Sequence, residues 1–229
     1  MMDTGARLKR HLEALKALRG ASTIAPARLQ ELKAYQAARL ARTYSDVAEQ
    51  PRYRLATSFF LRDLYGPKDF SGRDAAMLRI HPVMVRTLPD KAVETATRAI
   101  ELEALSESLD HRTAAALEPG PIDDDRYGRA YRAGSTREER ERQIELVVAV
   151  GRDLDWLVKK PLVLRTLRLM RTPARMTGLT DLQDFLERGF EAFAAMDGAD
   201  DFLATIERRE TAILNRLFSG AAEPFSISP

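Results

Sequence analysis

The segment from Lys159 to Arg175 has six basic side chains and no acidic one, so it is a candidate for binding an anionic group. Guanidinium groups bind phosphates and carboxylates through paired hydrogen bonds, so a row of arginines is typical of a site for an anionic partner. Arg165, Arg168 and Arg171 recur every three residues, and Arg175 follows four residues later. This spacing predicts one guanidinium per turn along one side of a short helix, forming a ligand or partner surface.

The same segment has a structural interpretation, in which these arginines form a solvated face paired with acids of neighbouring helices. The chain has 36 Lys and Arg and 34 Asp and Glu, a net charge of +2, so such acids are available. Near-balanced charge also argues against bulk attraction to nucleic acid or to an anionic membrane. Regulatory nucleic-acid binding through residues 159–175 therefore ranks third among the predicted functions.

A second candidate surface surrounds the aromatic segment FFLRDLYGPKDF at residues 59–70, which holds four of the sixteen aromatic residues. Gly66 and Pro67 stop the preceding helix, because Gly tolerates a left-handed cap and Pro cannot continue the hydrogen-bond ladder. The candidate site residues here are four alternating charges: Lys68, Asp69, Arg73 and Asp74. The alternative is a structural corner, in which Ser71 caps the next helix.

Several other kinds of chemistry lack the residues they need. The chain has no cysteine, which excludes disulfides, thiolate nucleophiles, zinc fingers and iron–sulfur clusters. None of His11, His81 and His111 has an acid three residues before it, so the Glu-x-x-His motif of di-iron bundles is missing. A Gly-x-Ser-x-Gly elbow and phosphate-binding glycine loops are also missing. We predict no metal site and no cofactor.

An enzyme or small-ligand protein with an internal pocket stays open as an alternative. His11 lies beside the apolar stripe of the first helix, where an imidazole could hold a haem iron. Asp155 and Glu210 fall among apolar residues of predicted helices, where burial could raise their pKa for acid–base work. Residues at such positions are more often paired with an arginine at the edge of the stripe. Whether the protein is an enzyme stays undetermined.

The elements that must position these residues are helices, because apolar residues recur at three- and four-residue spacing almost everywhere. We expect an all-α, single-domain bundle of about nine helices over residues 1–229, with a possible subdivision at the turn-rich segment 118–125. The helices with definable limits are 26–47, 51–65, 71–80, 89–117, 136–159, 180–196 and 199–218. His81 and Pro82 are expected in the connection after the helix at 71–80.

Local signals refine these elements. Ser135–Glu138 and Thr180–Gln183 match the capping box, which predicts where two helices begin. Gly151 and Gly189 interrupt apolar stripes and are expected to admit a close neighbour, either a crossing helix or a ligand. We also expect the phenylalanine-rich C-terminal helices to pack on the aromatic segment at 59–70, because aromatic side chains bury most favourably in one shared core.

Two stretches carry a resemblance to a known family. FFLRDLYGPKDFS-x-RD and GLTDLQDFLERGFEAFAAMDGADDFLATIERRE resemble bacterial helical proteins whose function is uncharacterised. The resemblance covers most of the chain from Tyr53 to Phe218. It implies a helical domain of bacterial origin and assigns no reaction, cofactor or partner.

Location and function follow from these observations as expectations. The first twenty residues space their apolar side chains at helical intervals, unlike a secretory signal. The longest apolar run, Leu146–Val150, is far shorter than a membrane span. We expect a cytoplasmic protein without membrane contact. The leading prediction is a non-catalytic protein-interaction or self-associating protein that uses exposed aromatic or arginine surface.

Overall fold

The chain forms α-helices, one π-helical turn and no β-strand over residues 4–21, 24–64 and 71–226, the parts described by a computed structural model. This confirms the all-α fold class. In chain order the elements are α1 (Thr4–Gly20), α2 (Pro26–Thr43), α3 (Ser45–Glu49), α4 (Arg54–Phe59), the π-helical η1 (Phe60–Leu64), α5 (Ser71–Thr87), α6 (Asp90–Ala116), α7 (Asp124–Gly134), α8 (Arg137–Val158), α9 (Pro161–Leu169), α10 (Arg171–Met176), α11 (Thr180–Ala195) and α12 (Asp200–Ser219).

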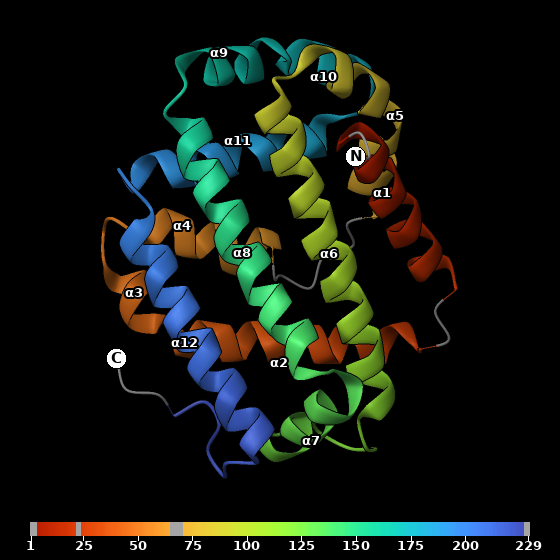
Figure 1. Ribbon diagram of the computed structural model, residues 1–229, viewed down its shortest axis with the longest axis vertical. Helices are drawn as coiled ribbons and strands as arrows, with labels where there is room; N and C mark the ends of the chain where they lie inside the picture. The colour runs from red at the N-terminus through yellow and green to blue at the C-terminus, as the bar shows by residue number, and fades with distance from the viewer. Residues whose placement is uncertain (1–3, 22–23, 65–70, 227–229) are drawn as a thin grey trace.

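The long helices form the body of the molecule, and α7, α9 and α10 close its two ends (Figure 1). α6, α8 and α12 run side by side along the long axis, with α1 against α6 and α2 crossing behind them (Figure 1). α7 closes the lower end, whereas α9 and α10 lie across the upper end (Figure 1). None of the described helices combines the length and apolar character that crossing a lipid bilayer requires.

Three apolar clusters hold the helices together. The first lies among α2, α3, α4, α8, α11 and α12, the second among α1, α5, α6 and α11, and the third among α2, α6, α7 and α12. Within the described chain, α9 contributes no residue to any of the three. Apolar burial therefore builds the bundle below α9 and leaves this helix on top of it.

The C-terminal helices pack on the aromatic segment, as expected. The rings of Tyr53 and Phe60 lie 5.5 Å and 6.3 Å from that of Phe202 in α12, and the ring of Phe59 lies 5.3 Å from that of Phe185 in α11. A Cβ atom on Gly189 would stand 2.9 Å from the Phe59 ring. This glycine therefore admits a packed aromatic side chain.

Gly151 plays the same part in α8. A Cβ atom there would stand 2.4 Å from the Cδ2 atom of Leu203 in α12. Both glycines admit a close neighbour, as predicted, and in both cases the neighbour is a side chain of the core. The glycines thus serve helix packing.

Two expected helix limits were wrong. The helix expected to run unbroken to Val47 ends at Thr43, and α3 follows after Tyr44. The helix expected to end near residue 80 continues to Thr87, so His81 and Pro82 are helical. Proline removes only one intrahelical hydrogen bond, and α5 packs along α1, where Nε2 of His81 lies 2.8 Å from a backbone carbonyl.

Two expected caps were also wrong. The capping box of α8 consists of Thr136 and Glu139, one residue later than expected. Ser135 instead donates its hydroxyl to the carbonyl of Tyr131, 2.5 Å away. α11 has no side-chain cap, because its N-cap residue is Leu179, whose side chain carries no hydrogen-bond acceptor. A capping pattern read along the chain gives only the approximate start of a helix, since competing acceptors decide which residue is used.

The turn-rich segment 118–125 is tied to its neighbours. Arg28 of α2 donates to the carbonyls of Glu118 and Gly120, at 2.5 Å and 3.2 Å. Asp123 accepts the backbone N–H of Arg126, so it caps α7. The segment is therefore a hydrogen-bonded connection anchored to α2.

Candidate functional site

α9 is the helix that presents the predicted arginines, and it buries none of its residues. Proline at position 161 suits its first turn, and the helix ends at Leu169. Met170 separates it from α10, which carries Pro173 within its six residues. Arg165 and Arg168 therefore belong to one helix and Arg171 and Arg175 to another, so the single row of guanidinium groups expected from the spacing is broken.

Large apolar side chains stand in solvent on the same two helices. Leu162, Leu169 and Met176 are 72%, 77% and 83% exposed, although side chains of this kind usually contribute to a core. We call the following set the α9–α10 surface: Trp156, Leu162, Arg165, Arg168, Leu169, Met170, Arg175 and Met176. Sequence reasoning found its arginines and missed its apolar residues. The seven-residue spacing of Leu162 and Leu169 could have indicated that both lie on one face of a helix.

Polar contacts from α11 hold α9 and α10 in place. Gln183, which is buried, donates its side-chain amide to the carbonyl of Leu167 at 2.6 Å and to Glu187 at 2.7 Å. Glu187 also accepts two hydrogen bonds from Nε of Arg171, at 2.7 Å and 2.9 Å, and one from its Nη2. Because these contacts are polar, they attach the helices without burying the apolar side chains.

The four predicted arginines differ in how they are used. Hydrogen bonds from Arg171, helped by one from Gln183, lower the pKa of Glu187 to about 2, and the nearby charge of Arg168 contributes. Arg165 and Arg175 are exposed and make no hydrogen bond or ion pair with any residue in the described part of the chain. Arg171 is thus an anchor between helices, while the other three guanidinium groups face solvent.

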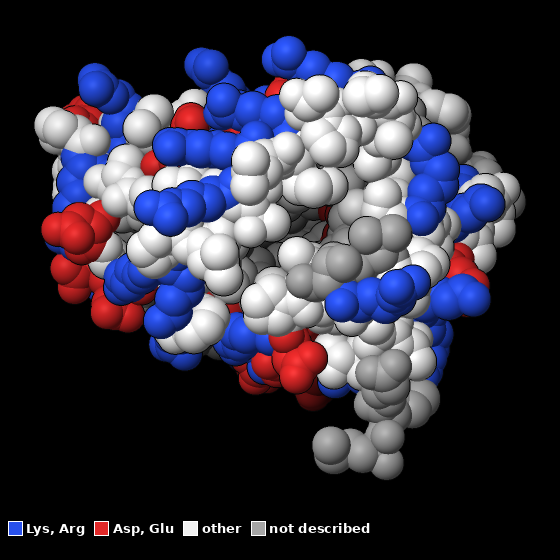
Figure 2. All heavy atoms as spheres, turned by 90° about the horizontal axis from the view of Figure 1, so that it is seen from above, with Lys and Arg blue, Asp and Glu red and all other residues white. Residues whose placement is uncertain are grey.

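The aromatic end of the α9–α10 surface carries a further cation. The ammonium group of Lys160 lies 4.3 Å from the ring centroid of Trp156, which is 46% exposed. Viewed from above, the face that carries α9 and α10 shows many blue basic side chains and fewer red acidic ones among white ones, and it is hollowed near its centre (Figure 2). Trp156 through Thr180 contains six basic residues and no acidic one. This end of the molecule is both basic and apolar.

The second group of predicted site residues cannot be placed in detail. Lys68 and Asp69 lie outside the described residues. Arg73 and Asp74 belong to the first turn of α5, and their side chains are likewise outside the description. The candidate surface at the aromatic segment therefore stays a prediction.

The acids considered for catalysis are bound to cations and backbone groups. Asp155 accepts the backbone N–H of Ala199 at 3.1 Å, just before α12, and binds Lys159 at 2.6 Å. Glu210 accepts two hydrogen bonds from Nη1 of Arg39 and one from the Tyr44 hydroxyl. Both acids hold helices together in this arrangement.

The histidines are dispersed. Partial burial lowers the pKa of His11, against the opposing charge of Glu101. His111 of α6 is buried, and its Nδ1–H donates to the carbonyl of Glu107 at 2.8 Å. Within the described ranges, no group of three or more His, Asp or Glu residues could hold a metal ion.

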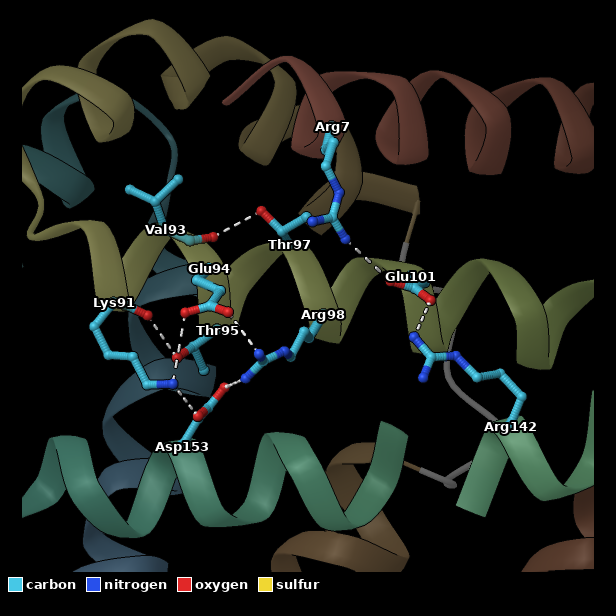
Figure 3. A network of polar contacts seen from close by, with 10 residues as sticks. All are labelled: Arg7, Lys91, Val93, Glu94, Thr95, Thr97, Arg98, Glu101, Arg142 and Asp153. Carbon is cyan, nitrogen blue, oxygen red and sulfur yellow. Dashed lines mark hydrogen bonds and ion pairs between the residues drawn. The ribbon is translucent and has the colours of Figure 1, made fainter. Parts of the chain in front are cut away.

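An ion-pair network that sequence reasoning missed joins α6 to α8. Asp153 of α8 binds Lys91 and Arg98 of α6, both at 2.5 Å (Figure 3). Glu101 of α6 binds Arg142 of α8 at 2.7 Å (Figure 3). We call the following set the α6–α8 seam: Lys91, Glu94, Arg98, Glu101, Arg142 and Asp153. The sequence places Lys91 and Arg98 seven residues apart, on one face of α6, which could have indicated a shared partner. It does not identify this partner, because Asp153 lies more than fifty residues away along the chain.

Two further hollows lie in the described part of the molecule. A surface groove of about 290 Å³ lies between α3, the start of α4 and α12. Asp46 and Arg209 on its wall bind each other through two hydrogen bonds, at 2.6 Å and 2.7 Å. A cavity inside the first apolar cluster has about 10 Å³, the volume of about one water probe, and is lined in part by Thr57. The groove is also lined by Gln50, Asp201, Thr205 and Arg208, whereas the lining of the cavity is mainly apolar.

Comparison with known proteins gives one match. A family model described as a domain of unknown function (DUF8198) matches residues 16–224. Neither the curated proteins nor the solved structures contain a match to the chain. The match carries no activity, so the function must be argued from the α9–α10 surface and the rest of the geometry.

Proposed function

We propose that this chain, which belongs to the DUF8198 family, is a non-catalytic protein-interaction protein whose contact surface is the α9–α10 surface. The observation that carries the proposal is the exposure of Leu162, Leu169 and Met176 at 72%, 77% and 83%, together on adjoining helices. Single exposed apolar residues are normal, but a group of them beside arginines marks an interaction site.

The composition of the surface supports a protein as the partner. Tryptophan, methionine and arginine are enriched at interfaces between proteins, and tryptophan and arginine dominate the residues that contribute most to binding. Trp156, Met170 and Met176 supply the apolar part, and Arg165 and Arg175 supply cations that need no internal bond to be broken. Burying this surface against a partner would remove apolar area from water.

The enzymatic alternative receives less support. Asp155 and Glu210 already accept hydrogen bonds from cations and backbone groups, so neither has a free carboxylate facing a pocket. In the groove between α3 and α12, Asp46 and Arg209 are bound to each other, and Asp201 and Arg208 line it beside them. The geometry therefore favours binding over catalysis.

We place the protein in the cytoplasm of a bacterium. The absence of cysteine from all 229 residues suits a reducing compartment, and the FFLRDLYGPKDFS-x-RD segment resembles bacterial helical proteins. The proposed partner is accordingly another protein of the same compartment or a second copy of this chain.

Site-specific photo-crosslinking in the cells that make the protein tests this function. A photoreactive amino acid at position 169 is expected to give a crosslinked species, which mass spectrometry then identifies as a second copy or as another protein. The matched control is position 55, because Leu55 of α4 is also an exposed leucine, at 54%, and lies outside the surface. Equal crosslinking from both positions, or none from 162, 169 and 176, would overturn the proposal.

A further inference from the structure

We infer that the α9–α10 surface binds an acidic amphipathic helix of another protein. This inference rests on the proposed function and adds the chemistry and shape of the partner. It follows from three features of the surface: the spacing of its leucines, the placement of its arginines among them, and the absence of acids from residues 156–180.

The leucine spacing fits a helix as the bound element. Leu162 and Leu169 are seven residues apart on α9, which places them two turns, or about 10 Å, apart on one face. Both are more than 70% exposed. A helix lying along α9 presents apolar residues at positions i, i+3 or i+4, and i+7, and this repeat has the same length.

The arginines give the sign of the partner's charge. Arg165 lies between the two leucines on the same face, and Arg175 lies near Met176 on α10. Both guanidinium groups lack partners in the described chain, and guanidinium groups bind carboxylates through paired hydrogen bonds. Arg171 already makes such a pair with Glu187 at this end of the molecule. Glutamates beside the apolar residues of the partner helix would form the same kind of arginine–carboxylate pair with Arg165 and Arg175.

Charge argues against a second copy as the occupant. A two-fold dimer brings the same patch of both subunits together, and the charged members of the α9–α10 surface are three arginines, Arg165, Arg168 and Arg175, with no acidic residue among its members. Like charges would then face each other across the interface, which costs free energy. A partner of opposite charge avoids this cost.

The mixing of cations and leucines argues against a lipid surface. Helices that lie in a membrane interface separate an apolar face, which enters the lipid, from a basic face, which stays in water. On α9, Arg165 lies between Leu162 and Leu169 on the outward face, so inserting the leucines would carry the guanidinium group toward the lipid. A protein helix with carboxylates beside its apolar residues matches this mixed face.

Binding to a designed peptide tests the inference. The probe is a fluorescent helix of about 20 residues with leucine at the a and d positions of each heptad and glutamate at most others, long enough to be helical when bound. Its control carries lysine in place of every glutamate. We expect the full-length protein to bind the glutamate peptide at least about tenfold more tightly than the lysine peptide, measured by fluorescence anisotropy at two salt concentrations.

Charge reversal sharpens the test. The Arg165→Glu/Arg175→Glu double variant should weaken binding of the glutamate peptide at least about tenfold and strengthen binding of the lysine peptide. The matched control, Arg54→Glu/Arg208→Glu, changes the net charge equally at exposed arginines outside the surface and should leave both affinities within about twofold. Leu162→Ser/Leu169→Ser should weaken both peptides.

The outcomes separate this inference from the proposed function. Equal affinity for the two peptides, or no binding of either, overturns the acidic helix while a crosslink from position 169 to another protein still supports the function. Binding to vesicles of anionic lipid or to nucleic acid, lost in the Arg165→Glu/Arg175→Glu variant and without peptide binding, overturns the inference in favour of that partner. A crosslink from position 169 only to a second copy overturns it as well.

Discussion

The α6–α8 seam and the α9–α10 surface are both rich in basic side chains, and they differ in where the carboxylates lie. In the seam, Lys91 and Arg98 both bind Asp153, whose side chain is only 8% exposed. On the surface, Arg165 and Arg175 have no partner in the described chain. The same residue types therefore hold helices together in one region and face solvent in the other.

The difference shows how stability and interaction are divided within one bundle. Cations in the seam compensate the buried carboxylate of Asp153, so removing this carboxylate takes away the partner that two cations share. Arg165 and Arg175 on the α9–α10 surface have no partner in the described chain, so they can be used for binding at little cost to the fold. Pairing, and not composition, separates the structural arginines from the candidate functional ones.

Removing the buried carboxylate should have the largest effect. Asp153→Ala removes the partner that Lys91 and Arg98 share across the two helices and leaves Glu94 as their only carboxylate in the seam. We expect the free energy of unfolding to fall by about 2 kcal/mol, less than for a fully buried pair because the two cations are partly exposed. Urea denaturation measures it. Glu145→Ala, which breaks an exposed pair on the same helix, should cost less than about 0.5 kcal/mol, and equal costs would contradict the contrast.

Buried hydroxyls extend the comparison to uncharged groups. The hydroxyl of Thr57 is buried and has no hydrogen-bond partner in the described chain, whereas that of Thr97 donates to the carbonyl of Val93 at 2.8 Å. Thr57→Val should raise the free energy of unfolding by about 1 kcal/mol, because it removes an unsatisfied polar group. Thr97→Val should lower it or leave it unchanged. Thermal denaturation of both variants measures these changes. A loss of stability in Thr57→Val would show that the Thr57 hydroxyl makes a hydrogen bond in the folded protein.

The surface should tolerate polar substitutions that a core rejects. Leu169→Ser and Met176→Ser are expected to change the free energy of unfolding by less than about 0.5 kcal/mol, because both side chains are already exposed. Denaturant titration gives the stability, and crosslinking from position 162 gives the interaction. A large loss of stability would mean that these residues are buried in the folded protein in solution.

The smallest expected effect concerns the pair of Arg171 and Glu187, which attaches α10 to α11 beneath the α9–α10 surface. The pKa of Glu187 is about 2, lowered first by hydrogen bonds from Arg171. Because the folded pKa lies below the unfolded one, this pair stabilises the fold at neutral pH, and the contribution is lost as the pH falls from about 4.5 towards 2. Carboxyl NMR titration should find this pKa, and Arg171→Gln should raise it. A pKa near 4.5 in the unchanged protein would remove Arg171 from its role as an anchor.

Helix type and approximate limits followed from local patterns. The spacing from Pro89 to Leu117 predicted a helix that is observed at Asp90–Ala116, because proline and turn residues at both ends act through neighbouring backbone atoms. Prediction was wrong where a distant contact decided the outcome, as at Pro82, where α5 continues along α1. The cap of α8 shifted by one residue for a local reason, because Ser135 donates to the carbonyl of Tyr131 four residues earlier.

The candidate site was likewise predicted only in part from local patterns. The spacing of apolar residues predicted an all-α protein, and the composition showed that it has no cysteine and a basic segment at residues 159–175. These properties could be predicted because they depend on composition and local spacing. Only the tertiary structure decided that Arg171 is an anchor, that Arg165 and Arg175 face solvent, and that Leu162 and Leu169 stay uncovered. The physical reason is that pairing and burial depend on which helices approach one another, and residues far apart in the chain set that approach.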